Sequence, residues 1–297
     1  MEIRANNLGA VKSYFSEKLS DIYPQDEIKS FFEISVFHLL KLTRTQILIE
    51  LNKSLSESEL LKFVAVVKQL KTQKPIQYIF NAAPFYGMEL YVDNHVLIPR
   101  PETEELVQLV LKTLQNDGQF SLLYSNGGFG LNITDIGTGS GCIALAIKNN
   151  LPKAHVAAVD TSYEALKVAQ KNADKLKLKI TFVCADITRD YSKNLGYHII
   201  ISNPPYVTRD EQSLMKENVL KFEPHLALFA PEKKPLYFYE KIADFALNNL
   251  VQGGYLFFEI NQYYGNATRE LLVNKGFRDI DLLKDLNNNE RMIRCRL

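Results

Sequence analysis

The chain has 297 residues, of which 46% are hydrophobic and 23% charged, a composition typical of a globular protein with one or two domains. Its 35 basic and 34 acidic residues leave a net charge of +1, so no overall field attracts nucleic acid or an anionic membrane. The first residues start no apolar leader, and the sequence holds no run of eighteen apolar residues. We therefore expect a soluble protein without membrane contact.

The cysteines and histidines are too scattered to indicate a disulfide framework or a metal site. Cys142, Cys184 and Cys295 form no Cys-x-x-Cys pair, and the five histidines show no His-x-x-x-His spacing. We expect no bound metal and a reducing, cytoplasmic environment.

Residues 1–75 are predicted to form a small, all-helical domain. Ser56 with Glu59 indicates a capping box at the start of one helix. Two earlier apolar stripes indicate further helices: Leu8, Val11, Tyr14, Phe15 and Leu19, then Phe31, Ile34, Phe37, His38 and Leu40. The near-neutral charge of this region leaves two roles open, a stabilising cap or a docking platform for a protein substrate.

The character of the chain changes over residues 76–98, where aromatic and β-branched residues surround Pro84 and Gly87. This pattern predicts a β-hairpin that links two domains. Pro101 then fits the first turn of a helix. Arg100 stands between two prolines, and such a rigid arginine is suited to contact a substrate.

Residues 99–297 are predicted to form an α/β domain with a mostly parallel sheet. A glycine- and asparagine-rich surface loop is expected over residues 116–130. The expected strands cover residues 131–136, 155–159, 179–184, 198–202, 254–260, 277–283 and 291–296, and the expected helices cover residues 141–149, 162–175 and 236–249.

A glycine-rich loop follows the first of these strands and opens a helix, which is the usual place for a closely approached ligand. It is Gly-x-Gly-x-Gly, unlike the Gly-x-Gly-x-x-Gly of dinucleotide-binding proteins. Asp160 ends the next strand, where its carboxylate can accept ribose hydroxyls, and Asp186 follows the third, with Ile187 able to pack on an adenine ring. The loop residues proposed to bind the cofactor are Gly137, Thr138, Gly139, Ser140 and Gly141.

Ile199–Ser202 reads as a buried central strand that stops at Asn203-Pro204-Pro205-Tyr206. Asn203 and Pro204 can offer one side-chain and one backbone oxygen to the same planar –NH2 group, and Tyr206 can stack on that plane. When the two hydrogens of this –NH2 group bond to the two acceptors, its weakly nucleophilic nitrogen is directed at an electrophilic carbon. Together with the residues expected to bind an adenosyl group, this motif favours S-adenosylmethionine over NAD, because hydride transfer does not require two acceptors for an –NH2 group.

At this point the sequence resembles the protein-glutamine methyltransferases that modify peptide chain release factors, the family also called HemK or PrmC. The resemblance covers nearly the whole chain, with departures at residues 125–130 and 228–235. Matching segments in order are Gln77-Tyr78-Ile79, Phe85-Tyr86-Gly87, Leu97 to Glu105, the glycine loop, Asn203 to Tyr206, Phe222-Glu223-Pro224 and Asn289-Glu290-Arg291.

The resemblance implies a Rossmann-like class I methyltransferase domain with a seven-stranded sheet. It also implies S-adenosylmethionine-dependent methylation of the amide nitrogen N5 of the glutamine in the Gly-Gly-Gln motif of release factors. Asn203, Pro204, Pro205 and Tyr206 would contact the substrate amide, with Asn203 also beside the cofactor. We expect a monomer that does not bind nucleic acid.

Two alternatives stay open. An adenine amino-methyltransferase acting on DNA or RNA uses the same Asn-Pro-Pro-Tyr motif on a flipped base, although the charge of the chain argues against it. A non-enzymatic scaffold that binds the cofactor is the other alternative, and the intact motif argues against that.

Overall fold

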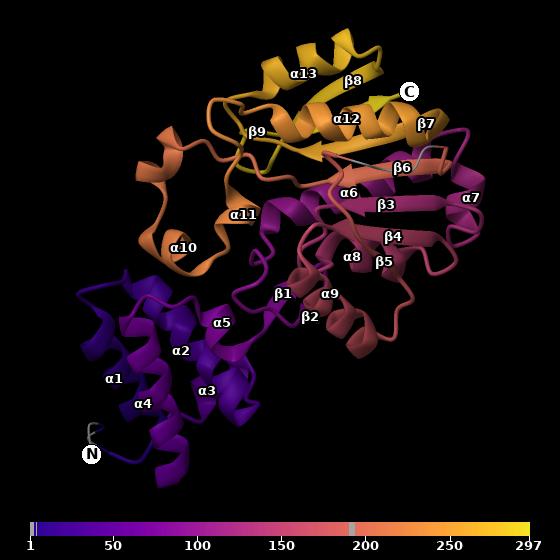
Figure 1. The fold of residues 1–297 in the computed structure, drawn as a ribbon. Coiled ribbons are helices and arrows are strands. Elements are labelled where there is room, and N and C mark those ends of the chain that lie inside the picture. Colours follow the sequence, from indigo (N-terminus) through magenta and orange to yellow (C-terminus); the bar gives the residue numbers. More distant parts are fainter. Residues whose placement is uncertain (1–2, 4, 190–193) are drawn as a thin grey trace. The chain divides into compact units, whose positions relative to one another are not determined.

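The computed structural model describes residues 3, 5–189 and 194–297, which divide into two compact units (Figure 1). The helical unit comprises Met1–Asn81 with Glu217–Phe222, and the sheet unit comprises Ala82–Lys216 with Glu223–Leu297. The sequence predicted the first boundary near residue 75 and left residues 217–222 with the sheet. The boundary lies later because Ile76–Phe80 is helical and Ile76 is buried in the core of the helical unit.

The core of the helical unit is rich in phenylalanine. Phe15 meets both Phe32 and Phe63 edge-on, at ring-centroid distances of 5.8 and 6.3 Å. The predicted capping box is confirmed, since Ser56 N donates to Glu59 Oε2 and Glu59 N donates to Ser56 Oγ. The helices of this unit are α1 (Leu8–Leu19), α2 (Gln25–Leu40), α3 (Arg44–Ile49), α4 (Glu57–Lys71), α5 (Ile76–Phe80) and α10 (Glu217–Phe222).

The predicted face of α1 is buried, whereas the predicted face of α2 is right only in part, since Phe31 is buried and Ile34 and Leu40 pack against the core. Phe37 is 45% exposed, whereas Phe32 and Val36 are buried. Apolar residues occur on more than one side of α2, so periodicity alone does not choose between faces. Contact of Phe32 with Phe15 selects the buried one.

The sheet unit begins with the antiparallel hairpin β1 (Ala83–Phe85) and β2 (Met88–Leu90). Tyr86 and Gly87 form its turn, both with positive φ. The hairpin is thus confirmed over a shorter stretch than residues 76–98. Helix α6 (Pro101–Asn116) follows, with Pro101 in its first turn as predicted.

The main sheet of the sheet unit has, among the described residues, seven strands in the order β5-β4-β3-β6-β7-β9-β8. The strands from β5 to β7 in this order are parallel, and β9 runs antiparallel to both its neighbours. The mostly parallel sheet predicted from the sequence is therefore confirmed. The strands are β3 (Asn132–Ile136), β4 (His155–Asp160), β5 (Thr181–Cys184), β6 (Tyr197–Ser202), β7 (Leu250–Glu259), β8 (Arg278–Lys284) and β9 (Glu290–Arg296).

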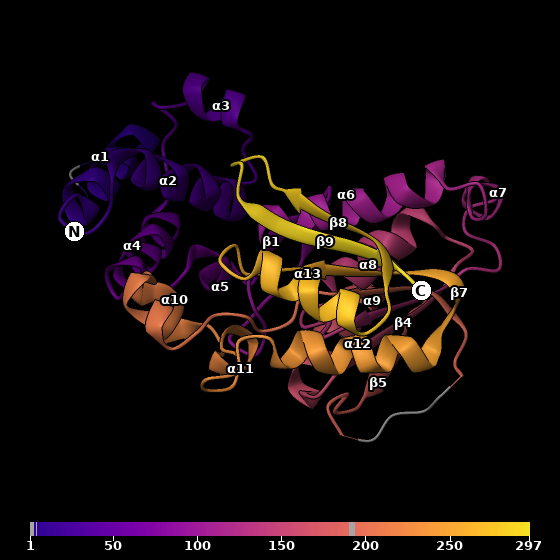
Figure 2. The same ribbon diagram turned by 90° about the horizontal axis from the view of Figure 1, so that it is seen from above.

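Helices cover both faces of this sheet (Figures 1 and 2). Ile199 and Ile201 of β6 pack into the core that includes α6 and α8, while Ile200 packs on the opposite side with α12. Alternate side chains of a strand point to opposite faces, so the isoleucine run serves two cores. The remaining helices are α7 (Ser121–Ser125), α8 (Cys142–Asn150), α9 (Tyr163–Leu176), the 3₁₀ helix Asp210–Leu214, α11 (His225–Leu228), α12 (Tyr237–Asn249) and α13 (Gly265–Asn274).

The segment expected to be a surface loop over residues 116–130 contains the short helix α7. Phe120, 1% exposed, anchors it by edge-on contacts with His198 and Tyr255. Among the described residues, no helix combines the length and apolar content needed to cross a bilayer.

Candidate functional site

A cavity of about 420 Å³ lies at the carboxyl ends of the parallel strands. The strand order reverses between β3 and β6, and open α/β sheets bind ligands in the crevice at such a point. The sequence-predicted residues that line it are Arg100, Gly137, Thr138, Gly139, Ser140, Asp160, Asp186, Ile187, Asn203, Pro204 and Pro205. Gly141 and Tyr206 are absent from the described lining residues.

The glycine loop presents open backbone to this cavity. Gly137 and Gly139 have φ of +73° and +53°, and a Cβ added to either would meet no atom within 4 Å. A ligand can therefore approach the main chain where side chains would otherwise fill the space. Gly141 has a different role, since a Cβ there would lie 3.1 Å from Ala169 Cβ, so this glycine lets α8 and α9 pack closely.

Several N–H groups of the loop donate hydrogen bonds to the neighbouring strand β4. Those of Gly137 and Thr138 donate to the Val159 carbonyl, at 2.8 and 3.0 Å. Gly139 N donates to Asp160 Oδ2 at 2.8 Å. A loop that binds phosphate instead directs its N–H groups at the ligand. The geometry therefore fits a ligand without a pyrophosphate, such as an adenosyl amino acid, better than a dinucleotide.

Asp160 fixes this loop as well as lining the cavity. Its second oxygen, Oδ1, accepts from Ser162 N at 2.8 Å, at the start of α9. Burial raises the pKa of Asp160, although the backbone hydrogen bonds act in the opposite direction. Each carboxylate oxygen can accept a further hydrogen bond, so contact with ribose hydroxyls is compatible with both existing bonds.

Asp186 and Ile187 line the cavity beyond β5. Asp186 Oδ1 accepts from the backbone and hydroxyl of Thr188, at 2.9 and 2.7 Å, and the hydroxyl bond is the main reason why the pKa of Asp186 is lowered. This turn holds the half-buried Ile187 at the cavity wall.

Asp135, which sequence reasoning did not assign to the site, lies buried beneath the loop. Its Oδ2 accepts from Thr138 Oγ1 at 2.6 Å and from Ala144 N at 3.2 Å, while its Oδ1 has no hydrogen-bond partner among the described residues. Burial raises the pKa of Asp135 to about 7. An acidic residue in the strand, two positions before the first glycine of the loop, was the signal that could have singled it out.

Asn203 and Pro204 line the cavity, and each carries an oxygen that can accept a hydrogen bond. Asn203 Nδ2 donates to Thr103 Oγ1 at 3.2 Å, which turns Oδ1 away from Thr103. No described residue donates to Asn203 Oδ1 or to the Pro204 carbonyl. Both oxygens thus remain free to accept a hydrogen bond from a ligand.

Tyr206 is not among the described residues that line the cavity. Its hydroxyl donates to Glu259 Oε1 at 3.1 Å, and its ring packs with the core on the α12 side of the sheet. Burial raises the pKa of Tyr206. The Tyr206 hydroxyl therefore ties the Asn203–Tyr206 motif to Glu259, a contact that the sequence did not reveal.

Arg100 lines the cavity and is held by a buried acid. Its Nη2 donates to Glu223 Oε1 at 2.6 Å, while Ile98 N donates to Glu223 Oε2 at 3.1 Å. Glu223 is 4% exposed. This pairing sets the direction of the arginine predicted to contact substrate. Within the described part of the chain, no cluster of His, Cys, Asp and Glu could hold a metal ion.

Comparison with known proteins identifies the family. A family model described as "PrmC N-terminal domain" matches residues 13–80, and one described as "Methyltransferase small domain" matches residues 106–226. A release factor glutamine methyltransferase from Flavobacterium psychrophilum is 44% identical over 96% of this chain and 98% of its own length. The chain belongs to the release factor glutamine methyltransferase family.

Another relative with the same name, from Bacteroides thetaiotaomicron, shares 39% identity over 96% of this chain and 99% of its own length. As a member of this family, the chain is a methyltransferase. The resemblance drawn from the sequence is thus confirmed.

Solved structures support the fold. A methyltransferase from Pyrococcus furiosus covers 71% of this chain and 89% of its own, with a TM-score of 0.50 and 16% identity. A 16S rRNA N2 G1207 methyltransferase from T. thermophilus, in complex with AdoMet and guanosine, covers 72% of this chain and 49% of its own, with a TM-score of 0.50 and 18% identity. The predicted class I methyltransferase fold is confirmed.

Proposed function

We propose that this chain transfers a methyl group from S-adenosylmethionine to the side-chain amide nitrogen N5 of the glutamine in the Gly-Gly-Gln motif of peptide chain release factors. The single observation that carries the proposal is the pair of acceptors, Asn203 Oδ1 and the Pro204 carbonyl, in the same cavity as the open glycine loop and Asp160. Family membership supports both the substrate and the reaction.

The residues that line the cavity fit the cofactor in their chemistry. Gly137 and Gly139 leave open backbone, Asp160 offers a carboxylate for ribose, and Ile187 offers an apolar surface for adenine. When bound, S-adenosylmethionine supplies a methyl group on a positively charged sulfur.

The residues of the chain then act by positioning the amide. Asn203 and Pro204 accept the two N–H groups, fix the plane of the amide and orient the weakly nucleophilic nitrogen. The same oxygens stabilise the positive charge that the nitrogen acquires as it takes the methyl group, and the surplus proton then passes to solvent water. Neither a metal nor a covalent enzyme intermediate is required in this scheme.

We further propose that the substrate is a protein, that residues 1–81 help to dock it, and that the enzyme is a cytoplasmic monomer. The net charge of +1 supports a protein substrate, because nucleic-acid binding usually draws on a basic surface. The three cysteines carry free thiols, which is compatible with a reducing compartment.

The experiment is methyl transfer from labelled S-adenosylmethionine to purified release factor. The expected product is N5-methylglutamine at the Gly-Gly-Gln motif, located by peptide mass spectrometry, with no label in a release factor whose glutamine is replaced by glutamate. Label in DNA or RNA, and none in release factor, would instead support the adenine amino-methyltransferase alternative.

A further inference from the structure

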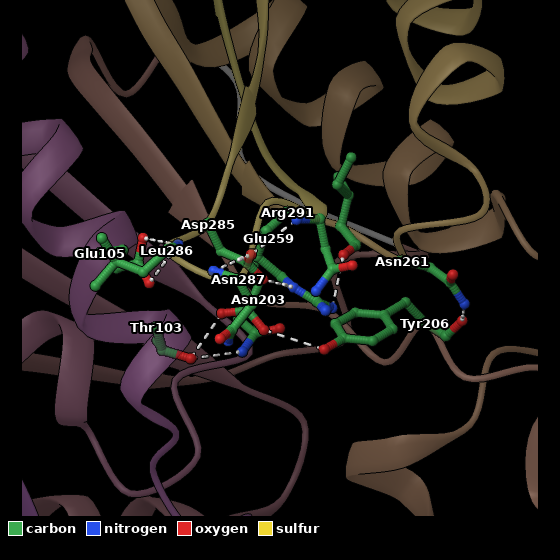
Figure 3. Close-up of polar contacts among 12 residues, drawn as sticks. Thr103, Glu105, Asn203, Tyr206, Glu259, Asn261, Asp285, Leu286, Asn287 and Arg291 are labelled. Atoms are coloured by element: carbon green, nitrogen blue, oxygen red, sulfur yellow. Dashed lines mark hydrogen bonds and ion pairs between the residues drawn. The ribbon is translucent and has the colours of Figure 1, made fainter. Parts of the chain in front are cut away.

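The Asn203–Tyr206 motif is supported from below by one buried carboxylate. Glu259, the last residue of β7, is 1% exposed. Its Oε2 accepts from Thr103 Oγ1 at 2.6 Å and its Oε1 accepts from the Tyr206 hydroxyl at 3.1 Å. Figure 3 shows these side chains converging from α6, from the segment after β6 and from the end of β7. Glu259 therefore bonds Tyr206 directly, and it is linked to Asn203 through Thr103.

The hydrogen bonds of this cluster have a defined direction. Glu259 Oε2 accepts from Thr103 Oγ1, so the single hydroxyl proton of Thr103 is directed to Glu259. Thr103 Oγ1 is then left as an acceptor, and the group that meets it must be a donor. Asn203 satisfies this by presenting Nδ2, at 3.2 Å. Its Oδ1 consequently points elsewhere, as an acceptor available to the substrate.

We propose that Thr103 and Glu259 are positioning residues that set which end of the Asn203 amide meets the substrate. The inference deepens the proposed function and rests on it. Because a carboxamide is nearly symmetric in shape, packing alone does not distinguish its two orientations. The hydrogen bonds from Asn203 to Thr103 and from Thr103 to Glu259, which we call the relay, do distinguish them. With Oδ1 presented, the site accepts an –NH2 group; with Nδ2 presented, it would favour a carboxylate.

Burial raises the pKa of Glu259, and the charge of Glu102 on α6 acts in the same direction. The hydrogen bonds from Thr103 and Tyr206, and the charge of Arg291 on the neighbouring strand β9, act in the opposite direction. Arg291 itself is held by Asp285 Oδ2, at 3.3 Å from its Nε. A buried, paired polar group of this kind costs stability when one partner is removed, so it calls for variants that keep the volume constant.

The test uses the full-length enzyme with Thr103→Val, which removes the hydroxyl, and Thr103→Ser, which keeps it. Thr113→Val is the matched control, because Thr113 is another buried threonine of α6 that lies outside the cavity lining. We expect Thr103→Val to lower kcat by about 10- to 100-fold and Thr103→Ser to retain most of the turnover, the scale expected when a preorganised group loses its orientation. Affinity for S-adenosylhomocysteine should be similar in all three.

The decisive readout is amide-against-carboxylate preference. Release factor with its Gly-Gly-Gln glutamine replaced by glutamate serves as inhibitor, and its inhibition constant is compared with the KM for unmodified release factor. Thr103→Val should lose most of the preference for the amide, and Thr113→Val should keep it. A merely structural role of Thr103 would lower stability and leave this ratio unchanged.

Glu259→Gln provides a second variant, because its amide can donate to Thr103 and so release the hydroxyl proton toward Asn203. It should shift the same preference without removing a hydroxyl. Wild-type preference in both Thr103→Val and Glu259→Gln would overturn the relay. If the wild-type enzyme itself methylates no glutamine of the release factor, the proposed function fails instead.

Discussion

Replacing Asp160 by alanine tests the cofactor half of the site. The carboxylate accepts from Gly139 N and Ser162 N, both at 2.8 Å, so the change frees the tip of the glycine loop and the start of α9 together. It also removes the group that we expect to bind the ribose hydroxyls.

The expected loss follows from these contacts. A hydrogen bond to a charged group contributes about 1.5–3 kcal/mol. Because Asp160 lines the cavity, water can replace part of what the two N–H groups lose. We therefore expect the cofactor affinity to fall by about one such bond, roughly 1–3 kcal/mol, or about 5- to 150-fold in Kd.

Isothermal titration calorimetry with S-adenosylhomocysteine measures this loss without turnover. Asp174→Ala is the control, because Asp174 is an exposed acid on α9 whose Oδ1 accepts only from Gln170 among the described residues. The control should bind like wild type. An unchanged Kd for a folded Asp160→Ala protein would refute the assignment of Asp160 to the cofactor site.

Four further outcomes are expected. Asn203→Ala should lower turnover by about 10²- to 10³-fold with nearly intact cofactor binding. Tyr206→Phe should lower turnover less, because the Tyr206 hydroxyl acts only through Glu259. Wild-type turnover in Asn203→Ala would contradict the role of Asn203 as an acceptor for the substrate amide. Chelator-treated enzyme should keep full activity, and activity restored only by a divalent metal would contradict the metal-free mechanism. Leu48 and Ile49 on α3 are 67% and 79% exposed. If the helical unit docks substrate, the double variant Leu48→Ser, Ile49→Ser should raise KM for release factor but not for cofactor. Equal effects on both KM values would favour a stabilising cap. Burial raises the pKa of Asp135 to about 7, so its native carboxyl keeps a proton that the unfolded chain loses near 3.8, and the associated stability is lost as pH rises from 3.8 through 7. The free energy of unfolding, measured with urea and without cofactor, should therefore fall less steeply between about pH 5 and 7 in Asp135→Asn than in wild type. Parallel declines would count against the shifted pKa.

The sequence predicted the chemical groups of the site because they belong to short, contiguous motifs. A glycine loop after a strand and a strand ending in Asn203-Pro204-Pro205-Tyr206 are each encoded within a few residues. The topology of parallel strands then brings their carboxyl ends to one edge, so their meeting follows from the α/β pattern. Gly141 shows the limit of this reasoning, because only the packing of α8 on α9 reveals why that glycine is required.

The groups that the sequence missed act across large separations along the chain. Thr103 and Glu259 are 156 positions apart, and Ile98 and Glu223 are 125 apart. Neither Thr103 nor Glu223 belongs to a pattern that indicates its partner. The buried face of α2 was predicted only in part for the same reason, since Phe15 on a neighbouring helix selects it.

By itself, therefore, the sequence determined the α/β class, the mostly parallel sheet and the place of the glycine loop after a strand, since local propensity, periodicity and glycine spacing specify them. Only the tertiary structure decided which way the Asn203 amide faces, where Tyr206 points and what holds Arg100. Those outcomes depend on single hydrogen bonds between side chains from different elements, which form only when the packed strands and helices bring the partners within reach.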